Sequence, residues 1–368
     1  MNLDQLQTPA LLIRLNRVRA NLERMRGLLE PHGGLQRWRP HVKTAKVPQV
    51  QQLLLDAGLR RFKCATSREA AVLCELAEQA GLAIDLLVAM AHRGANLARI
   101  AHLARAFPRH TLSILTEDLE HVREVRSHAA SLGLFVDLDP QFGRSGIALT
   151  DRARVRAVVD ACGEELRGLH AYEGHIRLPS ASERRAACAP LFDELCALAL
   201  ELGLERRETI TSGTPTFLEA LEHPGLRALH HRVSPGIVVY WDLNSAALGI
   251  QGFECAASVL ARVISAPRAG RVTLDAGSKS LDAAAGDPCV GVRGCDARAA
   301  KPSEEHLPLE LGSGRAPRLG ELLELVPRHV CPMINLAQSA VLLEGEQVLE
   351  IAPVSASGHE SGSWPRAN

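Results

Sequence analysis

The stretch RFKCATSREAAVLCELAEQAG, residues 61–81, holds one complete strand–helix unit. RFKCAT predicts a short strand, and the residues after it repeat apolar side chains at the spacing of a helix. Ser67 is a suitable N-cap for this helix, and Gly81 lies just past its expected end, where glycine is favoured. The stretch predicts one β-α unit, so the fold depends on how often that unit recurs.

The β-α unit recurs along most of the chain, from about residue 35 to residue 240. Short apolar runs alternate there with helical patterns, as expected for parallel strands that are buried on both faces. This alternation favours a barrel or a doubly wound sheet. From about residue 245 the chain is instead rich in valine, alanine and turn residues, so we expect the last third to be mainly β.

The composition narrows the class of protein. The 368 residues suffice for two domains, and 46% hydrophobic residues supply a sizeable core. Lys plus Arg equals Asp plus Glu at 42 each, and aromatic residues make up 3%, so we expect neither nucleic acid nor a membrane as partner. The sequence shows no apolar run of membrane-spanning length, no signal peptide and no C-x-x-C pair. We expect a cytoplasmic protein with reduced thiols.

The octet RPHVKTAK, residues 39–46, is basic in a chain of zero net charge. On a strand, His41, Lys43 and Ala45 would share one face, because side chains alternate between the two faces. In the first strand of a barrel, Lys43 would lie near the carboxyl end, where the active sites of barrels form. Taken alone, Lys43 is more commonly a solvated lysine at a strand end.

Two further loops follow predicted strands. In LDPQFGRSGI, residues 138–147, the glycines beside Arg144 would let the backbone approach an anion closely, although a plain turn with a surface arginine also fits. In HAYEGH, residues 170–175, Tyr172 and His175 lie at a strand end. A tyrosine packed in the core is the simpler interpretation of Tyr172.

Three motifs offer groups that could bind a phosphate or a metal. TSGTPT, residues 211–216, and SPGIVVYWD, residues 234–242, each place glycine and hydroxyl groups after an apolar strand and could bind a phosphate. Neither matches a Walker or Rossmann motif, and taken singly each is more commonly a plain loop. RHVCP, residues 328–332, has His329 and Cys331 two positions apart. On a strand both side chains would face one way and could bind a metal as imidazole and thiolate. The alternative is a buried cysteine beside an ordinary histidine.

These motifs occur together and in order, and the chain thereby resembles the D-threonine aldolase and D-serine dehydratase-like family. Members of this family are related to alanine racemase and use pyridoxal 5'-phosphate. The resemblance runs from TPALLIRLNRVRANLERM near the start to PRHVCPMINL and covers nearly the whole chain. It implies a (β/α)8 TIM-like barrel over residues 23–245. Residues 1–22 and 246–368 would form a mainly β domain that carries the H-x-C pair.

The resemblance also implies a role for each motif. Lys43 would form a Schiff base with pyridoxal 5'-phosphate, and Arg144 would lie near the cofactor's phenolic oxygen or the substrate carboxylate. His175 would lie close to the β-hydroxyl of the substrate. His329 and Cys331 would bind a divalent metal (zinc, manganese or magnesium). The other cofactor-binding residues that the resemblance implies are His41, Tyr172, Ser212, Gly213, Thr214, Gly236, Ile237 and Tyr240.

The implied function is a lyase that acts on D-3-hydroxy amino acids, foremost a D-threonine aldolase that forms glycine and acetaldehyde. A D-serine or D-3-hydroxyaspartate dehydratase would use the same residues. An amino-acid racemase would leave His329 and Cys331 unexplained, and a non-catalytic pyridoxal phosphate carrier would need neither that pair nor His175. Ala45 stands where relatives usually have a second histidine, which leaves the substrate side chain open. The resemblance implies a homodimer.

Overall fold

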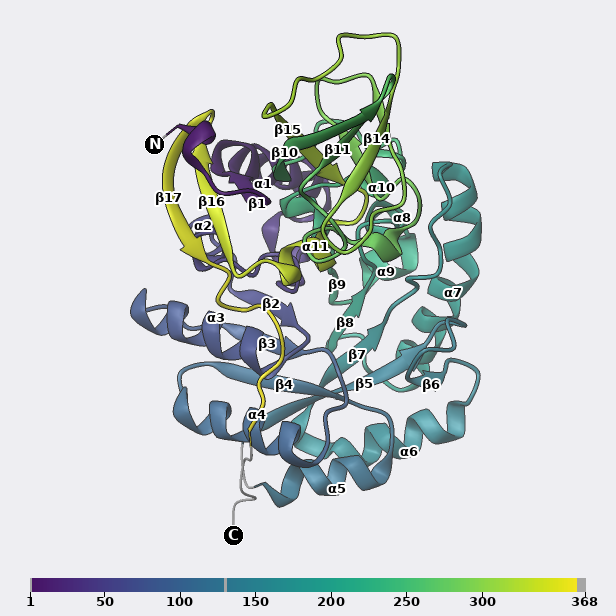
Figure 1. Cartoon of the computed structure of the whole chain (residues 1–368). Helices are drawn as coiled ribbons and strands as arrows, with labels where there is room; N and C mark the ends of the chain where they lie inside the picture. The colour runs from purple at the N-terminus through teal and green to yellow at the C-terminus, as the bar shows by residue number, and fades with distance from the viewer. Residues whose placement is uncertain (1, 129–130, 363–368) are drawn as a thin grey trace. The chain divides into compact units, whose positions relative to one another are not determined.

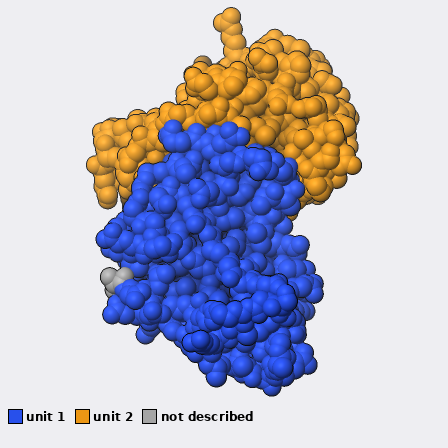
Figure 2. Space-filling view, turned by 90° about the horizontal axis from the view of Figure 1, so that it is seen from above, with its two compact units in different colours: residues 1–25, 44–50, 237–358 blue, residues 26–43, 51–236, 359–368 orange. Residues whose placement is uncertain are grey.

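The chain forms two compact units in a computed structural model that describes residues 2–128 and 131–362 (Figure 2). Unit 1 comprises residues 1–25, 44–50 and 237–358, and unit 2 comprises residues 26–43, 51–236 and 359–368. The domain boundaries drawn from the sequence, at 22/23 and 245/246, stay a prediction. The first and last positions of the predicted β domain, Met1 and residues 363–368, lie outside the described residues.

Unit 2 is built around a ring of parallel strands. Neighbouring strands pair in the order β2-β3-β4-β5-β7-β8-β9. The segment before β2 closes the ring, because Trp38 makes a parallel bridge with Val233 in β9 and His41 makes one with Lys63 in β2. The (β/α)8 barrel implied by the resemblance is therefore confirmed. The strands are β2 (Arg61–Cys64), β3 (Asp85–Val88), β4 (Thr111–Thr116), β5 (Leu132–Asp139), β7 (Leu166–Ala171), β8 (Glu208–Thr211) and β9 (His231–Val233), with a short β6 (Ile147–Ala148) beside β5.

Helices follow the strands of unit 2 and lie on their outer side (Figure 1). They are α3 (Ser67–Gln79), α4 (Gly94–Ala106), α5 (Leu119–Ser127), α6 (Arg152–Cys162), α7 (Ala181–Glu201), α8 (Phe217–Glu222) and α9 (Pro224–Ala228). Inside the ring, side chains from four strands pack into one apolar cluster, since alternate residues of each strand point inward. The cluster consists of Leu87, Leu115, Phe135 and Ile210.

The strand–helix unit at residues 61–81 shows how the sequence sets these elements. The strand β2 and the helix α3 lie where the sequence predicts them, and Gly81 follows the helix with a φ of 69°. The predicted N-cap is wrong by one residue. Thr66 has extended backbone angles and accepts a hydrogen bond from the Glu69 N–H at 3.1 Å, so Thr66 caps the helix and Ser67 is its first residue.

Unit 1 is a mainly β structure with a closed antiparallel sheet, as the resemblance implies. The order β11-β14-β13-β12-β15-β10 closes on itself because β10 also pairs with β11. The N-terminal strand β1 extends this sheet, antiparallel to β10 and parallel to β16. The strands are β1 (Ala10–Arg14), β10 (Ala257–Arg268), β11 (Arg271–Leu274), β12 (Val290–Val292), β13 (Ala297–Ala299), β14 (Leu307–Leu311), β15 (Leu322–Pro327), β16 (Ser339–Glu344) and β17 (Gln347–Pro353).

Few helices accompany the strands of unit 1. They are α10 (Leu243–Ala246) and α11 (Val330–Leu336), while α1 (Leu15–Leu29) and α2 (Pro48–Asp56) each include residues of both units. Single 3-10 turns cover Leu3–Gln5, Glu30–His32, Leu35–Arg37, Gly163–Glu165, Ile237–Val239 and Ala283–Ala285. Within residues 2–128 and 131–362, no helix has the length and apolar composition that crossing a membrane requires.

Candidate functional site

Polar and aromatic side chains gather where the parallel strands of unit 2 end. Lys43 comes two residues after the bridged His41, Arg144 lies in the loop after β5, and Tyr172 and His175 follow β7. The carboxyl ends of the strands of a parallel barrel all lie at one rim, and barrel active sites form there. The sequence therefore brings residues from distant parts of the chain to one end of the barrel.

The octet around Lys43 is not a continuous strand. Trp38 and His41 make the strand bridges, but Val42 and Lys43 form a turn in which the Lys43 N–H lies 3.4 Å from His41 Nδ1. The prediction that His41, Lys43 and Ala45 share one strand face is wrong, because the chain leaves the extended conformation before Lys43. The Lys43 side chain is exposed, and no described carboxylate forms an ion pair with it.

Arg144, Tyr172 and His175 come together around the ring of Phe142. The Arg144 guanidinium lies 4.9 Å from the centre of the Tyr172 ring and 5.1 Å from that of Phe142. The His175 ring stacks on Phe142 with 5.3 Å between ring centres. A guanidinium is attracted to the face of an aromatic ring at these distances. The contacts hold Arg144 in place without an ion pair to any carboxylate in the described residues.

A buried lysine, Lys63, lies beside these residues and was missed at the sequence level. Its side chain is 4% exposed, and its Nζ lies 3.4 Å from His170 Nε2. His170 Nδ1 in turn lies 2.7 Å from Asp137 Oδ1, and Ser145 donates a hydrogen bond to Asp137 Oδ2 at 2.9 Å. The sequence offers only a weak signal for this group, because Lys63, Asp137 and His170 each stand between apolar residues of a predicted strand.

The surroundings of Lys63 shift several pKa values. Burial, followed by the positive charges of Lys43 and Arg144, lowers the pKa of Lys63 to about 7. Burial also lowers the pKa of His170, and the charge of Lys63 adds to the effect. The pKa of Asp137 is lowered overall, because the hydrogen bond and charge of His170 outweigh the effect of burial. At neutral pH an ionised Asp137 therefore faces a neutral His170.

The loop after β8 presents polar groups that fit a phosphate. Ser212 has a left-handed backbone with a φ of 63°, and Glu173 fixes the loop by accepting hydrogen bonds from the Ser212 N–H and the Thr216 hydroxyl. The hydroxyl of Thr214 is buried and has no hydrogen-bond partner among the described residues. A Cβ on Gly213 would lie 3.0 Å from the Tyr172 ring. An unpartnered hydroxyl in a narrow glycine loop beside an aromatic ring fits the phosphate end of pyridoxal 5'-phosphate.

Gly236 follows β9 and is buried. Ile237 and Tyr240, which were also predicted to bind the cofactor, belong to unit 1. Ile237 begins a 3-10 turn and is half-buried. Tyr240 is fully buried, and its hydroxyl has no hydrogen-bond partner in the part of the chain that the structure describes. Burial raises the pKa of Tyr240, and the charge of Cys331 adds to the effect. Within unit 1 the structure therefore places Tyr240 in the neighbourhood of Cys331.

The H-x-C pair lies at the start of a helix, so the prediction that it lies on a strand is wrong. β15 ends at Pro327, and His329 is the N-cap residue of α11, with Cys331 in its first turn. Asp242 accepts a hydrogen bond from the Val330 N–H at 3.0 Å, which satisfies one of the free N–H groups at the start of the helix.

The two proposed metal ligands have other neighbours within unit 1. The Cys331 Sγ lies 3.1 Å from the Thr44 hydroxyl, and His329 Nδ1 lies 3.6 Å from Asp282 Oδ2. No set of three or more His, Cys, Asp and Glu side chains in the described residues is placed to hold a metal ion. The metal site therefore stays a prediction.

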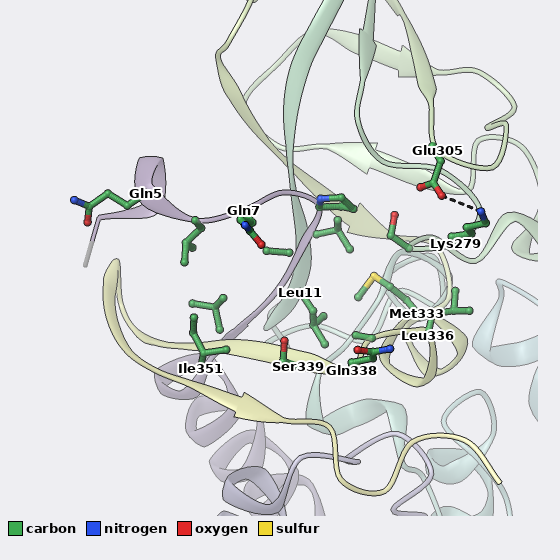
Figure 3. A pocket seen from close by; sticks show the side chains of 17 residues that line it. Gln5, Gln7, Leu11, Lys279, Glu305, Met333, Leu336, Gln338, Ser339 and Ile351 are labelled. Atoms are coloured by element: carbon green, nitrogen blue, oxygen red, sulfur yellow. Dashed lines mark ion pairs between the residues drawn. The ribbon is translucent and has the colours of Figure 1, made fainter.

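Unit 1 also contains a cavity of about 570 Å³ that holds none of the predicted site residues (Figure 3). Its wall includes Gln5, Gln338 and Met333, and Lys279 forms an ion pair with Glu305 at 3.0 Å beside it. Glutamine and apolar side chains dominate this wall. It offers fewer reactive groups than the barrel rim, where Lys43, Lys63, His175 and Arg144 gather.

Comparisons with known proteins show which family the chain resembles. Residues 13–244 match the model of the alanine racemase N-terminal domain, and residues 256–343 match that of a putative serine dehydratase domain. The chain is 30% identical to a D-threonine aldolase of an Arthrobacter species, over 97% of this chain and 94% of the relative. It is 26% identical to a 3-hydroxy-D-aspartate aldolase of Paracoccus denitrificans (strain Pd 1222) over the same shares. The crystal structure of a D-threonine aldolase from Filomicrobium marinum superposes with a TM-score of 0.81, at 27% identity and 96% coverage of both chains.

Proposed function

The chain belongs to the D-threonine aldolase and D-serine dehydratase-like family of pyridoxal phosphate-dependent lyases, and from that premise we propose that it is a D-threonine aldolase. The proposed reaction splits D-threonine into glycine and acetaldehyde. One observation carries the proposal furthest. Lys43, Lys63 and Arg144 are basic groups at the barrel rim, and none of them forms an ion pair with a described carboxylate. Such a rim suits a ligand with several negative charges, as a phosphorylated cofactor and an amino-acid carboxylate provide.

Each group at the rim has a proposed task in holding the cofactor. The amine of Lys43 would hold it covalently, and the exposed position of Lys43 leaves that amine open to attack a carbonyl. The Thr214 hydroxyl and the N–H groups around Gly213 would bind the phosphate. The Tyr172 ring would pack against the bound group. When bound, pyridoxal 5'-phosphate supplies an electron sink, so that a bond at the Cα of the amino acid can break.

The substrate needs two further groups. Arg144 would bind the substrate carboxylate, because its guanidinium is fixed by two rings but not neutralised. His175, exposed and stacked on Phe142, would remove the proton of the β-hydroxyl. We further propose that His329 and Cys331 hold a divalent metal as imidazole and thiolate ligands. We also propose a homodimer, which light scattering of the purified protein would test.

A D-serine or D-3-hydroxyaspartate dehydratase is the second candidate. The match of residues 256–343 to a putative serine dehydratase domain favours it, since this segment contains both His329 and Cys331. The same Lys43 would then take the proton from the substrate Cα, and the β-hydroxyl would leave. The two candidates differ in which bond at the substrate breaks, so the products distinguish them.

The test is to incubate the purified protein and pyridoxal 5'-phosphate with D-threonine, D-serine and D-3-hydroxyaspartate separately, before and after treatment with a chelator. Glycine with acetaldehyde from D-threonine supports the aldolase. Pyruvate with ammonia from D-serine, without glycine from D-threonine, would contradict the aldolase and support the dehydratase. Turnover that survives complete removal of divalent metal would contradict the proposed role of His329 and Cys331. Lys43→Ala is the matched inactive control.

A further inference from the structure

Lys63 is a second lysine next to Lys43, and the proposed function gives it no task. The backbone of Lys63 pairs with the segment that carries Lys43, because the Val42 N–H donates a hydrogen bond to the Lys63 carbonyl at 2.7 Å. The charge of Lys43 acts directly on the Lys63 amine. A lysine that is 4% exposed is unusual unless a carboxylate pairs with it.

No carboxylate neutralises Lys63 in the described residues. Lys43 and Arg144 face it as cations, and Asp137 and Glu173 face it as anions. Asp137 is occupied by His170 and Ser145. Glu173 is likewise occupied, since it binds the loop after β8. The amine therefore lies among groups of both signs without an ion-pair partner in the described residues, and His170 Nε2 at 3.4 Å is its hydrogen-bond neighbour.

His170, beside Lys63, determines which hydrogen bond the Lys63 amine can make. An ionised Asp137 accepts a hydrogen bond from the Nδ1–H of His170, which leaves the lone pair on Nε2. Nε2 can then accept one N–H from Lys63 across 3.4 Å, a long hydrogen bond. The remaining valences of the Lys63 nitrogen are free for a ligand, and Asp137 and His170 hold the nitrogen in position.

We propose that Lys63 is a further cofactor-binding residue, which meets the phenolic oxygen of the pyridoxal ring and takes up a proton as that oxygen binds. The phenolic oxygen is the anionic group next to the aldehyde carbon that Lys43 would attack, and Lys63 is the buried cation next to Lys43. This inference rests on the function proposed above. No covalent step is involved, because one proton moves from solvent to the Lys63 nitrogen.

Linkage between binding and protonation gives the proposal a measurable consequence. In the free protein the pKa of Lys63 is about 7, so the amine is mostly neutral near pH ~8. An anionic oxygen close to the amine favours its charged form and raises that pKa. Binding near pH ~8 should therefore draw close to one proton per site from the solvent. Near pH ~6, where Lys63 is already charged, the same binding should draw almost none.

The experiment is calorimetric titration of the protein, freed of cofactor, with pyridoxine 5'-phosphate near pH ~8, in two buffers of different ionisation enthalpy. This probe keeps the phenol and the phosphate but has no aldehyde, so it cannot react with Lys43. Wild type is compared with Lys63→Met, with Lys63→Gln, and with Lys301→Met, which removes an exposed lysine of unit 1. Comparison between proteins cancels the probe's own ionisation. If Lys63→Met does not fold, as judged by circular dichroism, Lys63→Gln, which keeps a donor for His170, takes its place.

The expected result is a proton uptake that is close to one per site larger in wild type and Lys301→Met than in either Lys63 variant, with about ten-fold weaker binding in those variants. Equal uptake in all four proteins would overturn the proposal and leave the proposed function standing. Inorganic phosphate serves as a second probe, and an equal Lys63-dependent uptake with it would overturn the assignment to the phenolic oxygen. Failure of wild type to bind pyridoxine 5'-phosphate would overturn both this proposal and the cofactor site itself.

Discussion

The two ends of the barrel in unit 2 differ in whether their basic side chains form ion pairs. At the amino ends of the strands, Arg39 is fully buried and forms ion pairs with Glu208, at 2.7 Å, and with Asp85. At the carboxyl ends, Lys43, Lys63 and Arg144 have no ion-pair partner in the described residues. Both ends belong to the same ring of strands, so the difference does not follow from the fold.

The difference indicates which end is built for stability and which for binding. A buried charge is costly unless a partner and hydrogen bonds compensate it, and Arg39 has both. At the other end Lys43 and Arg144 are exposed, and the buried Lys63 has no ion-pair partner in the described residues. This is the arrangement expected where a ligand supplies negative charge. Substitutions at the amino end should therefore change stability, and those at the carboxyl end should change binding and turnover.

The largest effect is expected for Lys43→Ala. Loss of the amine that holds the cofactor should lower kcat for D-threonine by about a thousand-fold or more. Because the Lys43 side chain is exposed, the free energy of unfolding should change by less than about 0.5 kcal/mol. Turnover and urea unfolding are measured on the same preparation, with Lys301→Ala as the control. Turnover close to that of wild type would show that Lys43 does not take part in the reaction.

Arg39→Met should show the reverse pattern. Removing the guanidinium leaves Glu208 buried without its main partner, which should cost about 3–5 kcal/mol in the free energy of unfolding. Arg144→Met is the matched control, since Arg144 is exposed and packs on the rings of Phe142 and Tyr172, and its cost should stay below about 1 kcal/mol. Urea unfolding of both variants measures this. Equal losses in the free energy of unfolding for both variants would contradict the difference between the two ends of the barrel.

The pH dependence of stability should reveal Lys63 in the protein without cofactor. The pKa of Lys63 is about 7 in the folded chain and 10.5 in a model peptide. Between these values the unfolded chain binds more protons than the folded chain, so the free energy of unfolding rises with pH. The cost of burying a charged Lys63 is fully present only below pH 7. From pH ~7.5 to pH ~9, wild type should gain about 2 kcal/mol relative to Lys63→Met. Parallel curves for the two proteins would show that Lys63 titrates normally.

Gly213→Ala should give the smallest effect, confined to binding. Its added Cβ would lie 3.0 Å from the Tyr172 ring, so we expect pyridoxal 5'-phosphate to bind several-fold more weakly, a change of about 1 kcal/mol. Gly27→Ala, in helix α1 with nothing within 4 Å of the added carbon, should bind the cofactor normally and slightly stabilise the helix. Fluorescence titration with the cofactor compares the two variants. Normal binding by Gly213→Ala would contradict the phosphate assignment of this loop.

Much of the barrel could be predicted from the sequence because the β-α alternation is a local pattern. Strands such as β2 and β7 and the loops with Arg144 and Tyr172 lie where the apolar runs place them. Turns and caps were harder, because they depend on distant partners. The turn at Lys43 comes directly after bridges to β2 and β9. The helix at Cys331 begins where the Val330 N–H donates a hydrogen bond to Asp242, which lies 88 residues away in sequence.

Lys63 could not be identified as a site residue by reasoning from motifs alone. In the sequence it is one lysine in a strand, and only packing shows that it is buried among Lys43, His170 and Arg144. Phe142 is a similar case, since its contacts with His175 and Arg144 depend on two separate strand ends. Residue types define the chemistry that a chain can perform, and tertiary contacts decide which of them share a site.

The most direct test asks which lysine carries the cofactor. The protein is incubated with pyridoxal 5'-phosphate, reduced with borohydride and digested, and the pyridoxyl group is located by mass spectrometry. The account predicts the label on Lys43, with Lys63, the buried amine whose pKa is about 7, left unlabelled. A label on Lys63, or on neither lysine, would contradict the assignment of Lys43 as the residue that binds the cofactor.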